Sequence, residues 1–239
     1  MMHLQANDNL PQSLFLNPVW HALRTKQHRH LANSTADACR YPADVVPFAA
    51  VNEPNADAMR QLQALLAPGE STWLVGEQYP QVPQLPCEET LQCFQMVLPA
   101  KVPAPSPNTD IVLLSSANAP EMVALTTLAF PGFFRSRTCE MGSYYGVRSP
   151  PGELIAMAGE RLQLDGYSEI SAVCTHPSFR GQGFGASLIW HLVRNHRRDG
   201  LVSWLHVGCA NHHAVKLYLR MGFQQVRRVT LHRVTRQTL

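Results

Sequence analysis

Long apolar runs are missing from this sequence. None approaches the roughly 18 residues that a membrane-spanning helix needs. Residues 1–12 are polar and lack the apolar stretch of a secretion signal. We therefore predict a cytoplasmic protein without a membrane partner.

A concentrated excess of charge is missing as well. Lys and Arg number 20 against 17 Asp and Glu, which gives a formal net charge of +3. Proteins that bind nucleic acids concentrate basic residues on one face. The nearest approach to such a patch is a group of arginines near the C-terminus: Arg227, Arg228, Arg233 and Arg236. We interpret them as a solvated strand face, with attraction of an acidic ligand as the alternative, and predict no nucleic-acid partner.

Cysteine and histidine lack the spacings of disulfide frameworks and metal sites. The six cysteines, at 39, 87, 93, 139, 174 and 209, include no CxxC pair. Such scatter in a chain of 239 residues favours reduced thiols. The histidine groupings lack metal-site spacing or carboxylate partners: His28-x-His30, His206 and His212-His213. No metal is predicted.

Proline divides a chain that can otherwise bury a core, since 45% of its residues are hydrophobic and 15% charged. Four prolines fall within nine residues: Pro99, Pro103, Pro105 and Pro107. Because proline fixes φ and lacks an N–H group, this segment predicts an extended linker. The predicted organisation is an N-terminal α/β lobe at 1–100, a linker at 101–109 and a second domain at 110–239.

The first half carries no phosphate loop, metal spacing or nucleophile motif, so its role is not readable from the residues. Apolar periodicity and flanking turn residues predict its elements. These are helices over Asn17–Arg24 and Asn55–Leu66 and strands over Thr72–Val75 and Cys93–Leu98.

The second half has a different pattern, in which antiparallel strands precede a β-loop-α-β-α unit. The predicted strands are Ile111–Leu114, Tyr144–Val147, Leu154–Met157, Glu169–Thr175, Leu201–Val207 and a final pair; the predicted helices are Glu121–Phe130, Gly183–Arg198 and Asn211–Met221. This order predicts a mixed α/β fold.

One loop of the second half has the residues of a phosphate cradle. Arg180-Gly181-Gln182-Gly183-Phe184-Gly185 follows a β-branched strand and opens an amphipathic helix. Glycines let backbone N–H groups approach a ligand, and the helix N-terminus adds unpaired donors with a partial positive charge. Arg180 can add a charged donor. The loop therefore predicts pyrophosphate binding.

Three interpretations of this loop compete. In the first, the glycines form a turn before the helix and bind no ligand. A dinucleotide site fits Gly181-x-Gly183-x-x-Ala186, but the next strand ends at His206-Val207-Gly208-Cys209 without the carboxylate that would bind a ribose. A P-loop is excluded because no G-K-[ST] is present.

The third interpretation comes from resemblance to a family. Arg180-x-x-Gly183-x-Gly185 resembles the [RQ]-x-x-G-x-[GA] acyl-coenzyme A (CoA) loop of the GNAT superfamily of N-acetyltransferases. A second block, Asn211 to Phe223, resembles that family's N-x-x-A-x-x-x-Y-x-x-x-G-F signature position by position. Together the resemblance covers roughly residues 110–239. It implies a mostly antiparallel central sheet flanked by helices, preceded here by a smaller α/β lobe similar to a degenerate copy.

The resemblance also implies roles for individual residues. Tyr218 would be the general acid for the leaving thiolate. From strand position we choose Glu169 as the candidate base and Glu160 as second choice, with a surface carboxylate or a salt-bridge partner as the alternative for either. We interpret Cys174 as a strand residue that contributes its backbone. The implied cofactor-binding residues are Val173, Cys174, Thr175, Arg180, Gly181, Gln182, Gly183, Phe184, Gly185, Ala186 and Asn211. Asn211 and Gly222 are also explained as helix caps without any ligand.

The expected activity is transfer of an acetyl group from acetyl-CoA to the amine of a small molecule or amino acid by direct attack. The arrangement is similar to two-lobed relatives of the glycine N-acyltransferases, with at most one cofactor site and a monomeric or homodimeric state. The alternative is a non-catalytic acyl-CoA-binding module. No residue pattern identifies the acceptor.

Overall fold

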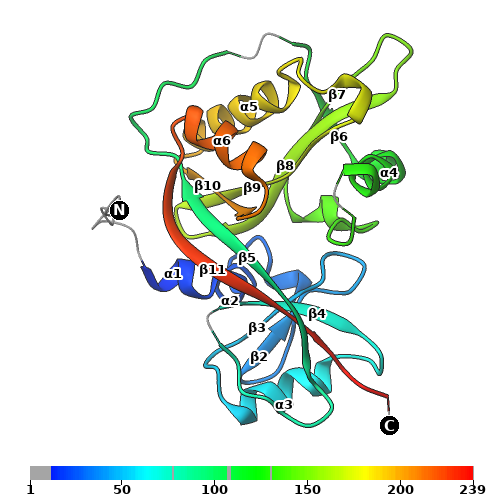
Figure 1. Cartoon of the computed structure of the whole chain (residues 1–239), viewed down its shortest axis with the longest axis vertical. Coiled ribbons are helices and arrows are strands. Elements are labelled where there is room, and N and C mark those ends of the chain that lie inside the picture. The colour runs from blue at the N-terminus through cyan, green and yellow to red at the C-terminus, as the bar shows by residue number, and fades with distance from the viewer. Residues whose placement is uncertain (1–11, 77, 107–108, 130, 239) are drawn as a thin grey trace.

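The centre of the molecule is one large sheet (Figure 1). The computed structural model describes residues 12–76, 78–106, 109–129 and 131–238. In these residues the sheet has 11 strands in the order β1-β2-β3-β4-β11-β5-β10-β9-β8-β7-β6. Neighbouring strands are antiparallel except for the parallel pairs β3–β4 and β9–β10. The predicted mixed, mostly antiparallel fold is confirmed.

The elements follow each other along the chain in two similar runs. The first run contains α1 (Gln12–Leu16), α2 (Pro18–Ala22), β1 (Asn33–Ser34), β2 (Ala38–Arg40), β3 (Phe48–Val51), α3 (Ala56–Leu65), β4 (Ser71–Gly76) and β5 (Cys87–Val97). The second contains β6 (Val112–Leu114), α4 (Ala119–Ala129), β7 (Tyr144–Arg148), β8 (Leu154–Leu164), β9 (Tyr167–Thr175), α5 (Phe184–Arg198), β10 (Val202–Gly208), α6 (His212–Arg220) and β11 (Gln224–Thr235). Short 3₁₀ turns cover Arg29–Leu31, Ser116–Asn118, Thr138–Met141 and Pro177–Phe179.

The last strand of each run pairs with the other run. β5 lies between β10 and β11, and β11 lies between β4 and β5. In Figure 1 both strands cross from the upper to the lower part of the molecule. Strands from the two sides of the predicted linker at 101–109 therefore alternate in the sheet, although the linker separates the two runs in the sequence.

One sequence prediction was wrong at the C-terminus. The expected final pair of strands is a single 12-residue strand, β11. No glycine, proline or asparagine, the residues that favour a turn, interrupts this strand. Near its start the register with β5 shifts between Gln225 and Arg227.

Local signals account for most helices. Asn55 caps α3, since its side chain accepts a hydrogen bond from the Ala58 N–H group at 2.9 Å. The apolar face of α5, with Leu188, Leu192 and Val193, is buried against the sheet, and each such side chain contributes about 1.5–3 kcal/mol. The predicted end of α4 at Phe130 lies outside the described residues.

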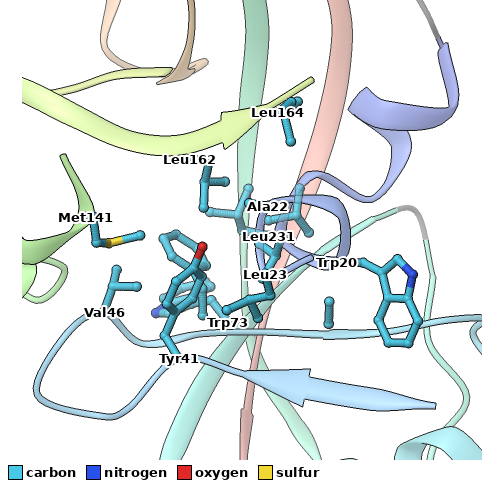
Figure 2. Close-up of a cluster of buried hydrophobic side chains, with 14 of the residues drawn as sticks. Trp20, Ala22, Leu23, Tyr41, Val46, Trp73, Met141, Leu162, Leu164 and Leu231 are labelled. Atoms are coloured by element: carbon cyan, nitrogen blue, oxygen red, sulfur yellow. The ribbon is translucent and has the colours of Figure 1, made fainter. Parts of the chain in front are cut away.

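A second core joins the two runs on the other face of the sheet. Figure 2 shows Trp20, Tyr41 and Trp73 of the first run packed with Leu162 and Leu231 of the second. The segment before β7 also reaches across, because the Phe133 ring stacks on Phe48 with 5.8 Å between centroids. Sheet and cores thus bring both runs into one packed body.

Candidate functional site

A cleft opens at the N-terminus of α5. Its volume is about 680 Å³, and it is lined by the end of β9, the loop after β9, the first residues of α5, and α6. Twelve of the fourteen residues that the sequence suggested line it: Val173, Cys174, Thr175, Arg180, Gly181, Gln182, Gly183, Phe184, Gly185, Ala186, Asn211 and Tyr218. The exceptions are Glu169 and Glu160.

The loop before α5 is shaped by two left-handed glycines. Gly181 has φ +81° and Gly183 has φ +83°, and a Cβ built at either position meets no atom within 4 Å. Gly183 is the N-cap of α5 and provides no side-chain cap. The N–H groups that start this helix therefore have no side-chain cap and stay available to a ligand, together with the positive end of the helix dipole.

Helix α6 begins differently. Asn211 caps it, since its side chain accepts a hydrogen bond from the Ala214 N–H group at 3.1 Å. The structural role that the sequence allowed for Asn211 is thus present, and the residue also lines the cleft. An anion in this cleft would therefore be drawn to α5 rather than to α6.

The strands beside the cleft separate. The parallel β9–β10 ladder joins Tyr167 to Val202 and ends at the Glu169–Trp204 pair. Beyond it, β9 pairs with β8 alone and β10 with β5. A bulge also interrupts β9, because Ala172 has φ +53° and the register shifts between the Met157–Cys174 and Gly159–Ser171 pairs. The gap and the bulge leave backbone groups of β9 without a strand partner on the β10 side.

Tyr218 comes from α6 and packs with its ring edge 5.6 Å from Phe223 between centroids. Burial raises the pKa of the Tyr218 hydroxyl well above its usual range. The hydroxyl is therefore protonated at neutral pH, as a proton donor must be.

The charge of the cleft lining is positive. Arg180 and Arg220 contribute guanidinium groups, and no Asp or Glu is among the described lining residues. Sequence analysis did not single out Arg220, which lies three residues before the Phe223 end of the second motif. The lining is suited to an anionic ligand.

Glu169 lies apart from the cleft and is fully buried. Arg161 donates two hydrogen bonds to its carboxylate, at 2.9 Å and 2.6 Å, and the Leu162 N–H group donates a third at 3.2 Å. Burial raises the pKa of this carboxyl, but the Arg161 charge and the hydrogen bonds outweigh burial and hold the pKa at about 2. Such a carboxylate is a weak proton acceptor at neutral pH.

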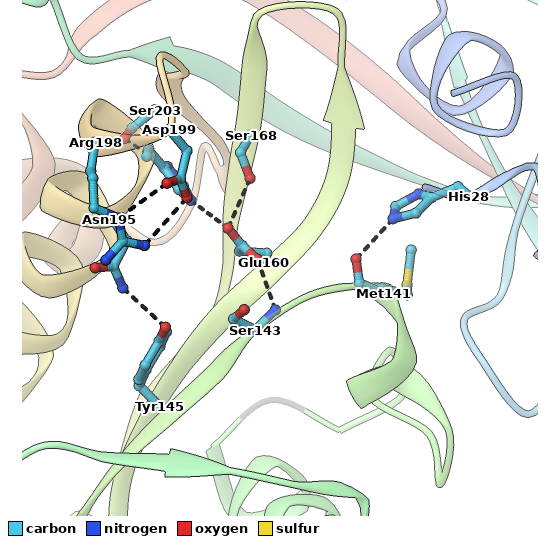
Figure 3. Close-up of polar contacts among 11 residues, drawn as sticks. His28, Met141, Ser143, Tyr145, Glu160, Ser168, Asn195, Arg198, Asp199 and Ser203 are labelled. Atoms are coloured by element: carbon cyan, nitrogen blue, oxygen red, sulfur yellow. Dashed lines mark hydrogen bonds and ion pairs between the residues drawn. The ribbon is translucent and has the colours of Figure 1, made fainter. Parts of the chain in front are cut away.

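Glu160, the second choice for a base, is also engaged. Figure 3 shows its contacts with Ser143 and Ser168, and His196 lies 2.9 Å from its Oε1 atom. Burial raises the pKa of Glu160, while the hydrogen bonds from His196 and the Ser143 N–H group lower it overall. The sequence could not indicate these contacts, because His196 comes from α5, 36 residues later.

Cys174 is buried at the edge of the cleft, and burial raises the pKa of its thiol to about 12. The thiol is therefore neutral, which agrees with a backbone role rather than a nucleophilic one. Within the described parts of the chain, no cluster of three metal-ligating side chains occurs, and no helix is long and apolar enough to cross a membrane.

Comparison with known proteins identifies related folds. Residues 144–232 match the family model described as FR47-like protein. A solved GNAT-family protein from Novosphingobium aromaticivorans DSM 12444 is 33% identical, with a TM-score of 0.84 over 94% of this chain and 99% of that one. A GCN5-related N-acetyltransferase from Kribbella flavida is 18% identical, with a TM-score of 0.57 over 93% and 94% of the two chains, and shows the fold alone. No curated protein matches the sequence.

Proposed function

This chain belongs to the GNAT family, and from that premise we propose that it is an N-acetyltransferase that uses acetyl-CoA and the primary amine of a small molecule or amino acid. The observation that carries the proposal is the cleft, in which a phosphate-binding helix end, a strand gap and a protonated tyrosine meet. A protein of the cytoplasm, monomeric or homodimeric, fits this activity.

The residues of the cleft fit acyl-CoA. The open space above Gly181 and Gly183 accommodates a pyrophosphate close to the backbone, where a side chain would intrude. Arg180 supplies a charged donor, and Asn211 lies across the cleft. The backbone of Val173, Cys174 and Thr175, which has no strand partner on the β10 side, would hold the pantetheine arm as a strand-like partner.

The chemistry follows from these groups. Acetyl-CoA supplies an acyl group activated as a thioester. A backbone N–H group at the β9 bulge would polarise the carbonyl, and Tyr218 would protonate the departing thiolate. The acceptor amine attacks directly, because the neutral Cys174 thiol is not suited to form a covalent intermediate.

The two similar runs support a two-lobed origin related to the glycine N-acyltransferases. α3 connects the parallel strands β3 and β4 as α5 connects β9 and β10. The turn before α3, Asn52-Glu53-Pro54-Asn55, has no glycine, and its Asn55 cap occupies a helix N–H group. The first run is therefore proposed as a degenerate copy without a cofactor site.

A second candidate is a binding module that has lost catalysis. The engagement of both Glu160 and Glu169 favours it, because neither carboxylate is free to act as a base. The two candidates differ in turnover, not in cofactor binding.

Release of free CoA thiol from acetyl-CoA, in the presence of a panel of amines, tests the proposal. We expect thiol release that depends on one class of amine, and a loss of about 10²-fold in kcat for Tyr218→Phe. Calorimetry should show acetyl-CoA affinity unchanged in that variant. Binding without turnover on any amine would establish the binding module instead.

A further inference from the structure

We propose that His206 accepts the proton that the acceptor amine loses, with Glu169 and Gln95 positioning its ring; this inference rests on the proposed N-acetyltransferase function. The observation behind it is a buried chain of polar side chains, Glu169–His206–Gln95, that crosses β9, β10 and β5. It lies where the β9–β10 ladder ends.

The location of His206 follows from the strand pairing. Trp204 is the last β10 residue paired with β9, so His206 lies just past the start of the gap. Leu205 and Val207 point into the core beneath α5, whereas Trp204 belongs to the core on the opposite face. By strand alternation, His206 points to that opposite face. The proposal places the acceptor amine on this face of the gap, on the side away from α5 and α6.

The hydrogen bonds of His206 fix its tautomer. Its Nδ1 atom is 2.7 Å from Oε1 of Glu169, and its Nε2 atom is 3.1 Å from Nε2 of Gln95. The Gln95 amide nitrogen also donates to the Phe15 carbonyl at 2.9 Å, and a carbonyl can only accept, so the amide is oriented with its nitrogen toward both partners. Nε2 of His206 is therefore the acceptor, and Nδ1–H donates to Glu169.

This tautomer places the basic lone pair on Nε2, where it accepts from Gln95, so the Gln95 amide has to turn away before Nε2 can take a proton. Glu169 keeps its negative charge through Arg161 and so stabilises an imidazolium without taking the proton itself. Gln95 also holds a spare acceptor, because its Oε1 atom is buried and has no hydrogen-bond partner. Rotation of the Gln95 amide would present this oxygen to a newly formed Nε2–H group.

The surroundings of His206 contain few other charges. Glu169 of β9 and Arg161 of β8 form the nearby ion pair. Tyr41 and Cys93 are close enough to interact electrostatically with both charges. Arg227 of β11 pairs in register with Gln95, and one of its buried guanidinium nitrogens has no hydrogen-bond partner. No second carboxylate contacts the imidazole among the described residues, so Glu169 is the group that orients it.

The proposed step is balanced. The amine nitrogen forms a bond to the acyl carbon, and the carbon–sulfur bond breaks. The thiolate takes a proton from Tyr218, and the proton lost by the amine goes to Nε2 of His206. Solvent then exchanges protons with both side chains, which restores the starting state.

His206→Gln tests the role, with His196→Gln as a matched control. His196 is a buried histidine with a carboxylate partner at 2.9 Å, but it lies on α5 away from the gap. We expect His206→Gln to lower kcat/KM about 10²-fold or more. The affinity for acetyl-CoA should stay within about twofold, and His196→Gln should keep the wild-type kcat/KM.

A readout without turnover separates this inference from the proposed function. Nitrogen NMR shifts of the ligand-free protein should place the His206 ring proton on Nδ1, and Gln95→Leu should produce a mixture of tautomers. A ring proton on Nε2, or an unchanged kcat/KM in His206→Gln, overturns the role of His206 alone. Equal losses in His206→Gln and His196→Gln would also overturn it. Wild-type protein that releases no CoA with any amine overturns the function and this role together.

Discussion

Gly183 has φ +83°, and a Cβ added there would point into the open cleft. Gly183→Val should therefore have two effects. The backbone strain should destabilise the protein by about 1–2 kcal/mol, and the side chain should exclude the cofactor phosphates. We expect calorimetry to detect no acetyl-CoA binding.

Gly200→Val is the matched control for that substitution. Gly200 follows α5, has φ +74°, and likewise has no atom within 4 Å of a built Cβ, but it lies at the opposite end of the helix from the cleft. It should lose similar stability while it keeps cofactor affinity. Equal affinities in the two variants would refute the phosphate-loop assignment.

The buried carboxylate of Glu169 should make stability depend on pH. Its pKa is about 2 in the folded state against 4.5 for the free group, so folding favours the charged form. The resulting stabilisation, about 3 kcal/mol, is fully present above pH 4.5 and is lost as the pH falls toward 2. The free energy of unfolding, measured with urea at several pH values across this window, should change less steeply with pH for Glu169→Gln than for the wild type. Identical slopes would mean that the ion pair with Arg161 is not maintained in solution.

The environment of Glu169 also shows which residue contacts could not be predicted from the sequence. The two motifs placed twelve residues at one cleft, because each motif is local and only one helix and one strand, α5 and β10, connect them. The partners of Glu169 are Arg161 and His206, eight and 37 positions away, and strand register brings them together. No local pattern contains that information, so the carboxylate was predicted as a base without its partners.

At the scale of elements, β5 and β11 show which predictions local signals support. The apolar end of β5 was predicted as Cys93–Leu98, but its polar first half, which starts at Cys87, was not. The β1, β2 and β3 strands gave no signal, since they are short and β2 and β3 are buried throughout rather than alternating. The predicted final pair of strands is the single strand β11, which pairs on both sides with strands of the first run, and no local pattern indicates those distant partners.

The position of β5 predicts how fragments behave. A fragment of residues 101–239 lacks β5, so β10 and β11 lose the strand between them and their buried side chains are exposed. We expect this fragment to lack a cooperative unfolding transition by circular dichroism. A fragment of residues 86–239 retains β5 and is the control that should unfold cooperatively. Cooperative unfolding of the shorter fragment would show that the second half folds without β5.

At the scale of the whole molecule, polar contacts fasten the two runs to each other. Nε2 of His28 lies 2.8 Å from the Met141 carbonyl, and the Thr138 hydroxyl donates to the Val45 carbonyl at 2.5 Å. The predicted linker is also held, because Arg197 donates to the Val102 carbonyl at 2.6 Å. Composition predicted a folded chain with a proline-rich divide, but proline spacing contains no information on what the divide packs against. Its partner α5 comes almost 100 residues later in the sequence.

The exchange of β5 and β11 has a consequence for synthesis on the ribosome. When β5 emerges, both of its neighbours, β10 and β11, are still untranslated, and β4 awaits β11 as well. The nascent first half therefore presents unpaired strand edges until β10 and β11 have left the exit tunnel. We expect the sheet to close only after β11 has been made, and these edges to be the surfaces most prone to aggregation in the interval.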